Sequence, residues 1–199
     1  MKTPRKRFAY SSALAALLLS SAATAAPRTL LLDAKKTQIR FFLEATLHTV
    51  EGSAPLVEGN IQFDLERGTA NGTVRIDARS ATTGNGIRDA TMHANVLESE
   101  RFPEIMFLPE RISEVRGNSR QRSATVHGQI KIHGGEHPFA IPVEADVDQS
   151  RIRIKARFVL PYVEWGMKDE STFLLRVGKT IAVHIDAAGT IDPPLLDAQ

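Results

Sequence analysis

The sequence predicts an all-β protein, an antiparallel β-barrel of about eight strands with one short helix. Apolar and polar residues alternate with a period of two in many short segments, which is typical of strands with one buried face. Turn residues separate these segments, and only one stretch has a helical pattern. Parallel sheets covered on both faces have continuously apolar strands, so the alternation disfavours a parallel α/β fold.

The clearest alternating segment is residues 151–158, where Ile152, Ile154 and Phe158 lie between basic residues. The same alternation occurs in residues 38–44, 60–64, 73–77, 125–133 and 181–186. Turns are predicted at Glu66-Arg67-Gly68, Gly117-Asn118, Gly134-Gly135, Asp148-Gln149-Ser150 and Val177-Gly178-Lys179. This spacing favours an antiparallel barrel or sandwich, and about eight strands suffice to close a barrel around one ligand.

A short helix is predicted over residues 86–97. Met92 and Val96 are four residues apart and so share one helix face. Asp89 falls in the first turn, where a negative charge complements the helix dipole. In an all-β domain, such a helix is expected to cap or plug one end of the barrel.

Residues 1–25 have the order of a secretory signal: a basic start, an apolar run and a small-residue end. Cleavage is predicted after Ala25, which places the mature chain in the periplasm or outside the cell. The apolar run is too short to span a bilayer, so a permanent anchor is disfavoured and no stable membrane insertion is expected. With no cysteine in the chain, lipid attachment at a cysteine is excluded.

Residues 26–199 are expected to form a single domain whose stability comes from packing, since the chain has no cysteine for disulfides. The signal contains four of the 25 basic residues and none of the 23 acidic ones. The mature chain is therefore slightly acidic and has no run of basic residues, which excludes a nucleic-acid binder.

Four segments of the chain carry recognisable motifs: Asp33 followed by Ile39-x-Phe41, residues 80–89, residues 102–107 and residues 126–134. Together and in this order they resemble the YceI-like family of exported polyisoprenoid-binding proteins. Residues 80–89, Ser-Ala-Thr-Thr-Gly-Asn-Gly-Ile-Arg-Asp, resemble its Ser-x-x-Thr-Gly…Arg-Asp segment, and residues 102–107 match its Phe-Pro-x-Ile-x-Phe strand. Residues 126–134 are similar to its Gly-x-Leu-Thr-Ile-His-Gly strand, and Asp33 followed by Ile39-x-Phe41 resembles its opening strand. The resemblance runs from about Thr29 to Ile191.

Two stretches depart from the family pattern. Lys36-Thr37 stands where the family usually has His-Ser, and residues 91–102 lack its His-Leu and Asp-Phe-Phe. The resemblance implies a lipocalin-like barrel that binds an apolar isoprenoid chain, such as a quinone or a prenyl lipid, as a carrier or sensor. It implies no enzyme activity, no cofactor and no catalytic or metal-binding residue.

Four phenylalanines at apolar strand positions are expected to point inward and line the ligand space, or else to be ordinary core: Phe41, Phe63, Phe107 and Phe158. Tyr162, Trp165 and Met167 follow the strongest strand and are expected to surround the mouth of the cavity or to pack over the barrel end. Arg88 is a candidate for a ligand's polar head group, with a structural role beside Asp89 as the alternative.

Two alternatives to a lipid-binding protein follow from the sequence. A barrel filled by its own side chains would be a periplasmic stress-related or structural scaffold. Residues 133–137, His-Gly-Gly-Glu-His, match a zinc-hydrolase pattern that requires a helix with His133 and His137 on one face and Glu136 as general base. Two central glycines and flanking strands favour a hairpin turn instead. The oligomeric state stays open between a monomer and a homodimer.

Overall fold

The computed structural model describes residues 27–173 and 175–195, so the predicted signal of residues 1–25 lies outside the described part. Ten strands, one α-helix and two short helical turns make up this part. The strands are β1 (Arg28–Leu32), β2 (Gln38–Glu44), β3 (Thr49–Ser53), β4 (Leu56–Asp64), β5 (Thr69–Asp77), β6 (Glu104–Gly117), β7 (Gln121–Ile132), β8 (Gly135–Asp148), β9 (Arg151–Leu160) and β10 (Ile181–Asp192). The helical elements are η1 (Ala34–Lys36), α1 (Gly86–Thr91) and η2 (Met92–Val96).

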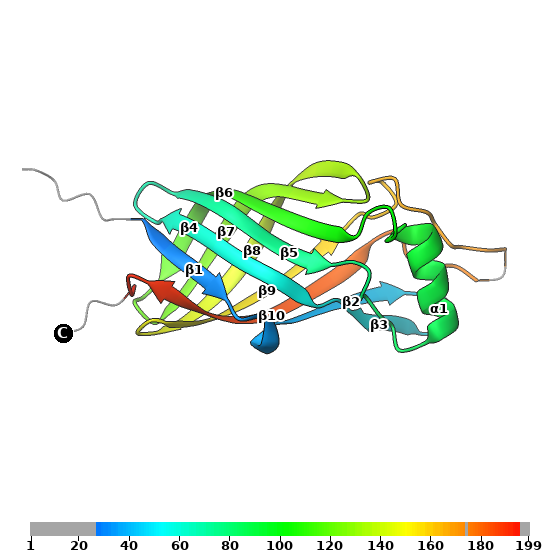
Figure 1. Cartoon of the computed structure of the whole chain (residues 1–199), viewed down its shortest axis with the longest axis horizontal. Helices are drawn as coiled ribbons and strands as arrows, with labels where there is room; N and C mark the ends of the chain where they lie inside the picture. The colour runs from blue at the N-terminus through cyan, green and yellow to red at the C-terminus, as the bar shows by residue number, and fades with distance from the viewer. Residues whose placement is uncertain (1–26, 174, 196–199) are drawn as a thin grey trace, which may run out of the picture.

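Eight of the strands form a closed antiparallel barrel in the order β1-β4-β5-β6-β7-β8-β9-β10. Strand β1 closes it, because β1 pairs with β4 on one side and with β10 on the other. The predicted barrel of about eight strands with one short helix is confirmed (Figure 1).

Strands β2 and β3 extend the barrel at the end where α1 lies (Figure 1). Strand β10 is long enough to pair with β1 through residues 189–192 and with β2 through residues 182–186. Strand β3 then pairs with β2. Ser53 at the end of β3 and Thr82 in the loop before α1 each donate a backbone N–H hydrogen bond of 2.8 Å to the carbonyl oxygen of the other. On the side of β3 that has no further strand partner, this loop therefore continues the wall of the barrel.

The predicted alternation places apolar side chains inside the barrel. Ile130 and Ile132 on β7 are buried and lie between outward-facing polar neighbours. Strands β1, β3 and β8 were not among the predicted segments. Strand β8 nevertheless alternates in the same way over residues 139–147. Its outward positions are partly proline and alanine, which weakens the contrast between the two faces.

The predicted helix of residues 86–97 is an α-helix that continues as a π-helical turn. The side chain of Asn85 caps the start of α1 by accepting a hydrogen bond of 3.1 Å from the backbone of Arg88. Residues 92–96 then form the π-helical turn η2. No helix in the described residues has the length and apolar character needed to cross a membrane.

The closing strand β1 offers a test of the barrel with a neighbouring control. Leu30 is 7% exposed in the core, whereas Leu31 is 49% exposed on the outer face. We expect Leu30→Ala to lower the free energy of unfolding by about 2–5 kcal/mol through the cavity that it leaves. Leu31→Ala should change it by about 0.5 kcal/mol or less. Urea denaturation checks both values, and equal effects would contradict the inward orientation of Leu30.

Candidate ligand-binding cavity

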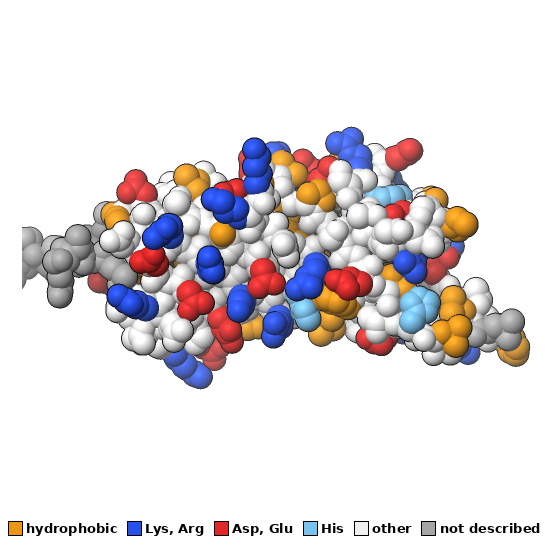
Figure 2. Space-filling model, turned by 90° about the horizontal axis from the view of Figure 1, so that it is seen from below, with side chains coloured by type: hydrophobic (Ala, Val, Ile, Leu, Met, Phe, Trp, Pro, Cys, Tyr) orange, Lys and Arg blue, Asp and Glu red, His pale blue; other side chains and the backbone are white. Residues whose placement is uncertain are grey.

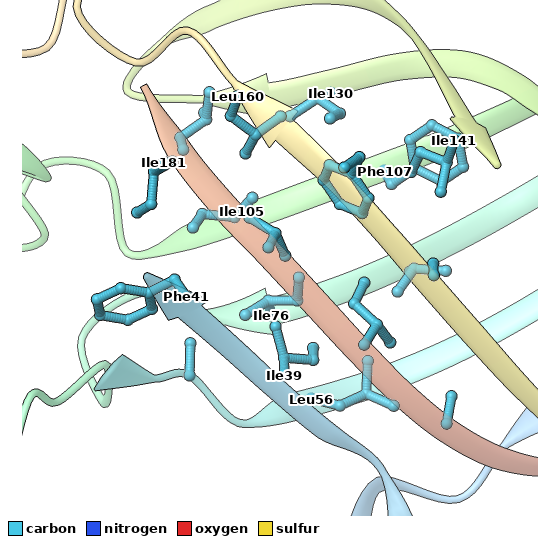
Figure 3. Close-up of a pocket in the computed structure, with 18 of the residues that line it drawn as sticks. Ile39, Phe41, Leu56, Ile76, Ile105, Phe107, Ile130, Ile141, Leu160 and Ile181 are labelled. Atoms are coloured by element: carbon cyan, nitrogen blue, oxygen red, sulfur yellow. The ribbon is translucent and has the colours of Figure 1, made fainter. Parts of the chain in front are cut away.

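The interior of the barrel holds a cavity of about 800 Å³. Inward side chains from the barrel strands and from β2 form much of its wall. Figure 3 draws 18 of the lining residues and labels ten of them, which come from widely separated parts of the chain. The labelled residues are Ile39, Phe41, Leu56, Ile76, Ile105, Phe107, Ile130, Ile141, Leu160 and Ile181. A volume of this size is in the range of cavities that enclose one small organic ligand.

The four phenylalanines singled out in the sequence all lie on the cavity wall. Phe41 comes from β2, Phe63 from β4, Phe107 from β6 and Phe158 from β9. Phe63 is the most buried, at 8% exposure, in the half of the core that lies toward the chain termini. Barrel closure brings these four strands around one space, although more than 100 residues separate Phe41 from Phe158.

Phe41 is positioned by a glycine on the neighbouring strand. Gly52 on β3 is the register partner of Phe41, and the Phe41 ring lies directly over it. A Cβ atom at Gly52 would come within 2.1 Å of the Phe41 Cζ atom. The missing side chain at position 52 therefore makes the space that the ring occupies.

Residues 161–167 after β9 divide between side chains that line the cavity and one, Trp165, that packs against the core without reaching the cavity wall. Tyr162 and Met167 are buried and line the cavity. The Tyr162 hydroxyl donates a 3.0 Å hydrogen bond to the carbonyl oxygen of Gly178, and burial raises the pKa of Tyr162 above its usual value. Trp165 is not part of the cavity wall.

Trp165 instead covers a seam between β8 and β9. These strands pair only through residues 143–148 of β8, so the first half of β8 has no partner on the β9 side. Trp165 stacks on His137 with ring centroids 4.2 Å apart and meets the Phe139 ring edge-on at 5.7 Å. Phe139 in turn lies 5.6 Å from Phe158 on the cavity wall. Aromatic packing therefore closes the barrel where strand pairing is missing.

The loop before α1 is held by a network around Thr83. Asp89 accepts hydrogen bonds of 2.7 Å from the Thr82 hydroxyl and from the Thr83 backbone. Arg88 donates to the Thr83 hydroxyl at 2.8 Å and to its carbonyl oxygen at 3.2 Å. Arg88 therefore has the structural role given as its alternative, and its side chain also lies on the cavity wall.

Polar groups on the wall gather mainly at the α1 end of the cavity. They comprise His48, Thr83, Asn85, Arg88, Thr91 and Glu170. Arg122, near the start of β7, is a charged wall residue at the opposite end that sequence reasoning missed. The sequence could have indicated it, because Arg122, Ala124 and Val126 are spaced two residues apart and therefore point to the same side of β7, the side that lines the cavity.

The segment that matches the zinc-hydrolase pattern is a hairpin turn, as its glycines predicted. His133 and Gly134 both have positive φ, 50° and 76°, between the end of β7 and the start of β8. Its three side chains contact different groups: His133 lies 2.9 Å from Glu98, Glu136 lies 2.6 Å from Lys131, and His137 stacks on Trp165. Among the described residues, no group of three or more His, Asp or Glu side chains is arranged to hold a metal ion.

A closed eight-stranded antiparallel barrel around an apolar cavity has the architecture of a lipocalin-type binding domain. The model of the YceI-like domain family matches residues 31–188, and the chain belongs to this family. The resemblance in the sequence is thereby confirmed. A search of curated proteins finds no match to the chain.

Solved structures share the fold at low sequence identity. BcnA from Burkholderia cenocepacia has a TM-score of 0.66 at 14% identity, covering 79% of this chain and 98% of its own. A polyisoprenoid-binding domain from Saccharophagus degradans, implicated in plant cell wall breakdown, has a TM-score of 0.64 at 13% identity, with coverage of 81% and 97%. The YceI protein of Campylobacter jejuni has a TM-score of 0.57 at 14% identity, with coverage of 73% and 86%.

The contact between Phe41 and Gly52 predicts a coupled pair. Gly52→Ala should lower the free energy of unfolding by about 1–3 kcal/mol, because the added methyl group displaces the ring. Phe41→Leu in the Gly52→Ala background should recover part of this loss. A double-mutant cycle in urea measures the coupling, and strictly additive effects would show that the two side chains do not interact.

The network at the start of α1 predicts a pH dependence. Hydrogen bonds from Thr83 and Thr82 hold the pKa of Asp89 below its ordinary value of 3.8. A lowered pKa in the folded state means that the ionised carboxylate stabilises the fold at higher pH, and that this contribution disappears as the pH falls through the lowered pKa. The stability difference between wild type and Asp89→Asn should therefore be constant above about pH 5 and shrink below about pH 4. Urea midpoints across this range measure it, and a difference that stays constant would contradict the prediction.

Proposed function

We propose that this protein is an exported, non-enzymatic binding protein that holds an isoprenoid, quinone-type or other lipid in its barrel. The observation that carries the proposal is the apolar cavity of about 800 Å³ that extends along the barrel interior. A scaffold barrel filled by its own side chains would leave no space of this size. The cavity therefore favours a carrier or sensor over the scaffold alternative.

The physical basis of binding is the transfer of an apolar chain out of water. Each Å² of apolar ligand surface that enters the cavity contributes about 25 cal/mol, so a long prenyl chain gains far more than its few polar atoms lose. The wall provides isoleucine, leucine, valine and phenylalanine side chains around this chain. Phe41, Phe63, Phe107, Phe158, Tyr162 and Met167 are the proposed contacts, and Trp165 supports them through Phe139.

The family and one of the similar structures support a lipid of the isoprenoid class. The chain belongs to the YceI-like family, and the Saccharophagus degradans domain with the same fold is described as polyisoprenoid-binding. Residues 1–25 support export to the periplasm, because a basic start followed by an apolar run is typical of a secretory signal.

Arg88 is the proposed contact for the ligand's polar head group. Its Nε and Nη2 atoms already donate to Thr83, which fixes the guanidinium on the cavity wall. A guanidinium carries five N–H donors, so others stay available for a carbonyl or phosphate oxygen. In this arrangement the head group lies at the α1 end and the chain extends toward the termini.

Two alanines on one strand offer a matched test of binding. Ala145 on β8 lines the cavity, whereas Ala140 on the same strand is exposed. We expect Ala145→Phe to project a ring into the cavity, obstruct the ligand's chain and lower the amount of bound prenyl lipid at least about tenfold, while Ala140→Phe leaves it unchanged. The measurement is mass spectrometry of an organic extract of each purified protein, followed by titration with a prenyl quinone.

Circular dichroism must show that both variants are folded. A folded wild-type protein that gives a clean extract and binds no added prenyl quinone would overturn the carrier proposal and favour the scaffold. Equal binding by Ala145→Phe and Ala140→Phe would place the ligand outside the cavity.

A further inference from the structure

The most exposed apolar side chains of the described residues all lie at one end of the barrel. Phe173 is 94% exposed, Ile87 is 85% exposed and Leu47 is 83% exposed, whereas Val159, the next in order, is 54% exposed on the outer face of β9. Exposed apolar side chains that gather in one region of a surface mark a site of contact with a protein or a membrane.

Two loops hold Leu47 and Phe173 on one protruding tip. The β2–β3 turn and the β9–β10 loop are joined by a hydrogen bond of 2.9 Å from the Thr46 backbone to the carbonyl oxygen of Arg176. A second bond of 2.9 Å runs from the Arg176 backbone to the Thr46 hydroxyl. The two loops therefore form one structural unit that projects beyond the barrel (Figure 1).

Figure 2 shows hydrophobic side chains gathered at this tip, whereas Lys, Arg, Asp and Glu side chains are spread over the flank of the barrel. We define the apolar rim as Leu47, Ile87, Phe173 and Leu175. Ile87 belongs to α1, which lies at the same end of the barrel as the tip (Figure 1).

The apolar rim is continuous with the cavity. Ile87 and Leu175 are exposed on the surface, at 85% and 40%, and both also line the cavity. His48, the neighbour of Leu47, lines it as well. An apolar molecule that entered or left the cavity at this end would pass along the rim.

Charges near the tip nearly cancel, since residues 168–179 contain three basic and two acidic residues. Between residues 168 and 179, Lys168 pairs with Glu170 at 2.7 Å. A hydrogen bond from Ser171, with a smaller contribution from the positive charges of Lys179 and Arg176, holds the pKa of Asp169 below its ordinary value. The tip therefore offers little net charge, and any attraction to a partner must come mainly from its apolar side chains.

From these observations we propose that the apolar rim docks on the surface of a lipid bilayer and places the mouth of the cavity against it. The rim consists of exposed side chains on two joined loops and on a short helix. Such a surface inserts readily into a deformable acyl phase. This inference rests on the proposed function for its purpose, because docking lets an apolar ligand move between bilayer and cavity without crossing water.

The test measures flotation of the purified full-length protein with phosphatidylcholine vesicles that contain no prenyl lipid. Leu47→Ser combined with Phe173→Ser removes both side chains of the tip, and Val159→Thr removes an exposed apolar side chain on the barrel flank as a control. All three proteins share the same N-terminus, so differences between them report on the substituted residues. We expect the double variant to bind at least about tenfold more weakly, and Val159→Thr to bind like wild type.

Raising the salt concentration from 0.05 to 0.5 M, or adding phosphatidylglycerol, should change binding less than about twofold, since salt screens only charge attraction. Equal vesicle binding by wild type and the double variant would overturn the proposal. So would a homodimer that the double variant abolishes, because the rim would then be covered by a second copy. Vesicle binding does not require a ligand in the cavity, so this test can succeed even if the titration with prenyl quinone fails.

Discussion

The pairing of β1 with both β4 and β10 is the constraint on which the rest of the structure depends. A strand of five residues thereby satisfies the backbone groups of two neighbours and turns an open sheet into a barrel. Closure also forces every inward side chain of eight strands toward one axis. The apolar interior is therefore a consequence of closure, and the cavity is what remains because these side chains do not fill the whole space.

The elements added to the barrel shape its mouth. Strands β2 and β3 extend past the point where β1 ends, and the Ser53–Thr82 bridge joins them to the loop before α1. Arg88 and Asp89 hold that loop through Thr83. Residues 80–89, one of the four segments that resemble the family, thus have a structural role, because they anchor the helix and the β2–β3 extension to each other.

The cavity and the apolar rim belong to one proposed mode of action. A lipid-binding barrel must both shield its ligand from water and exchange it with a source. The enclosed wall serves the first requirement, and exposed side chains that continue into the wall serve the second. The aromatic seam of His137, Trp165 and Phe139 keeps the flank closed, so exchange is expected at the α1 end.

Local patterns in the sequence determined strands β2, β4, β5, β7, β9 and β10, the helix start and the turn at residues 133–134, because alternation, capping and glycine content act over a few neighbouring residues. They did not identify β1, β3 or β8. They also placed Phe41, Phe63, Phe107 and Phe158 on inward faces, since period two assigns a side to each residue. Tertiary structure alone decided that Trp165 packs on His137 and Phe139 and not on the cavity wall, that Gly52 makes room for Phe41, and that the loops of Leu47 and Phe173 are joined in one tip. These outcomes depend on which strands become neighbours when the barrel closes, and no short stretch of sequence contains that information.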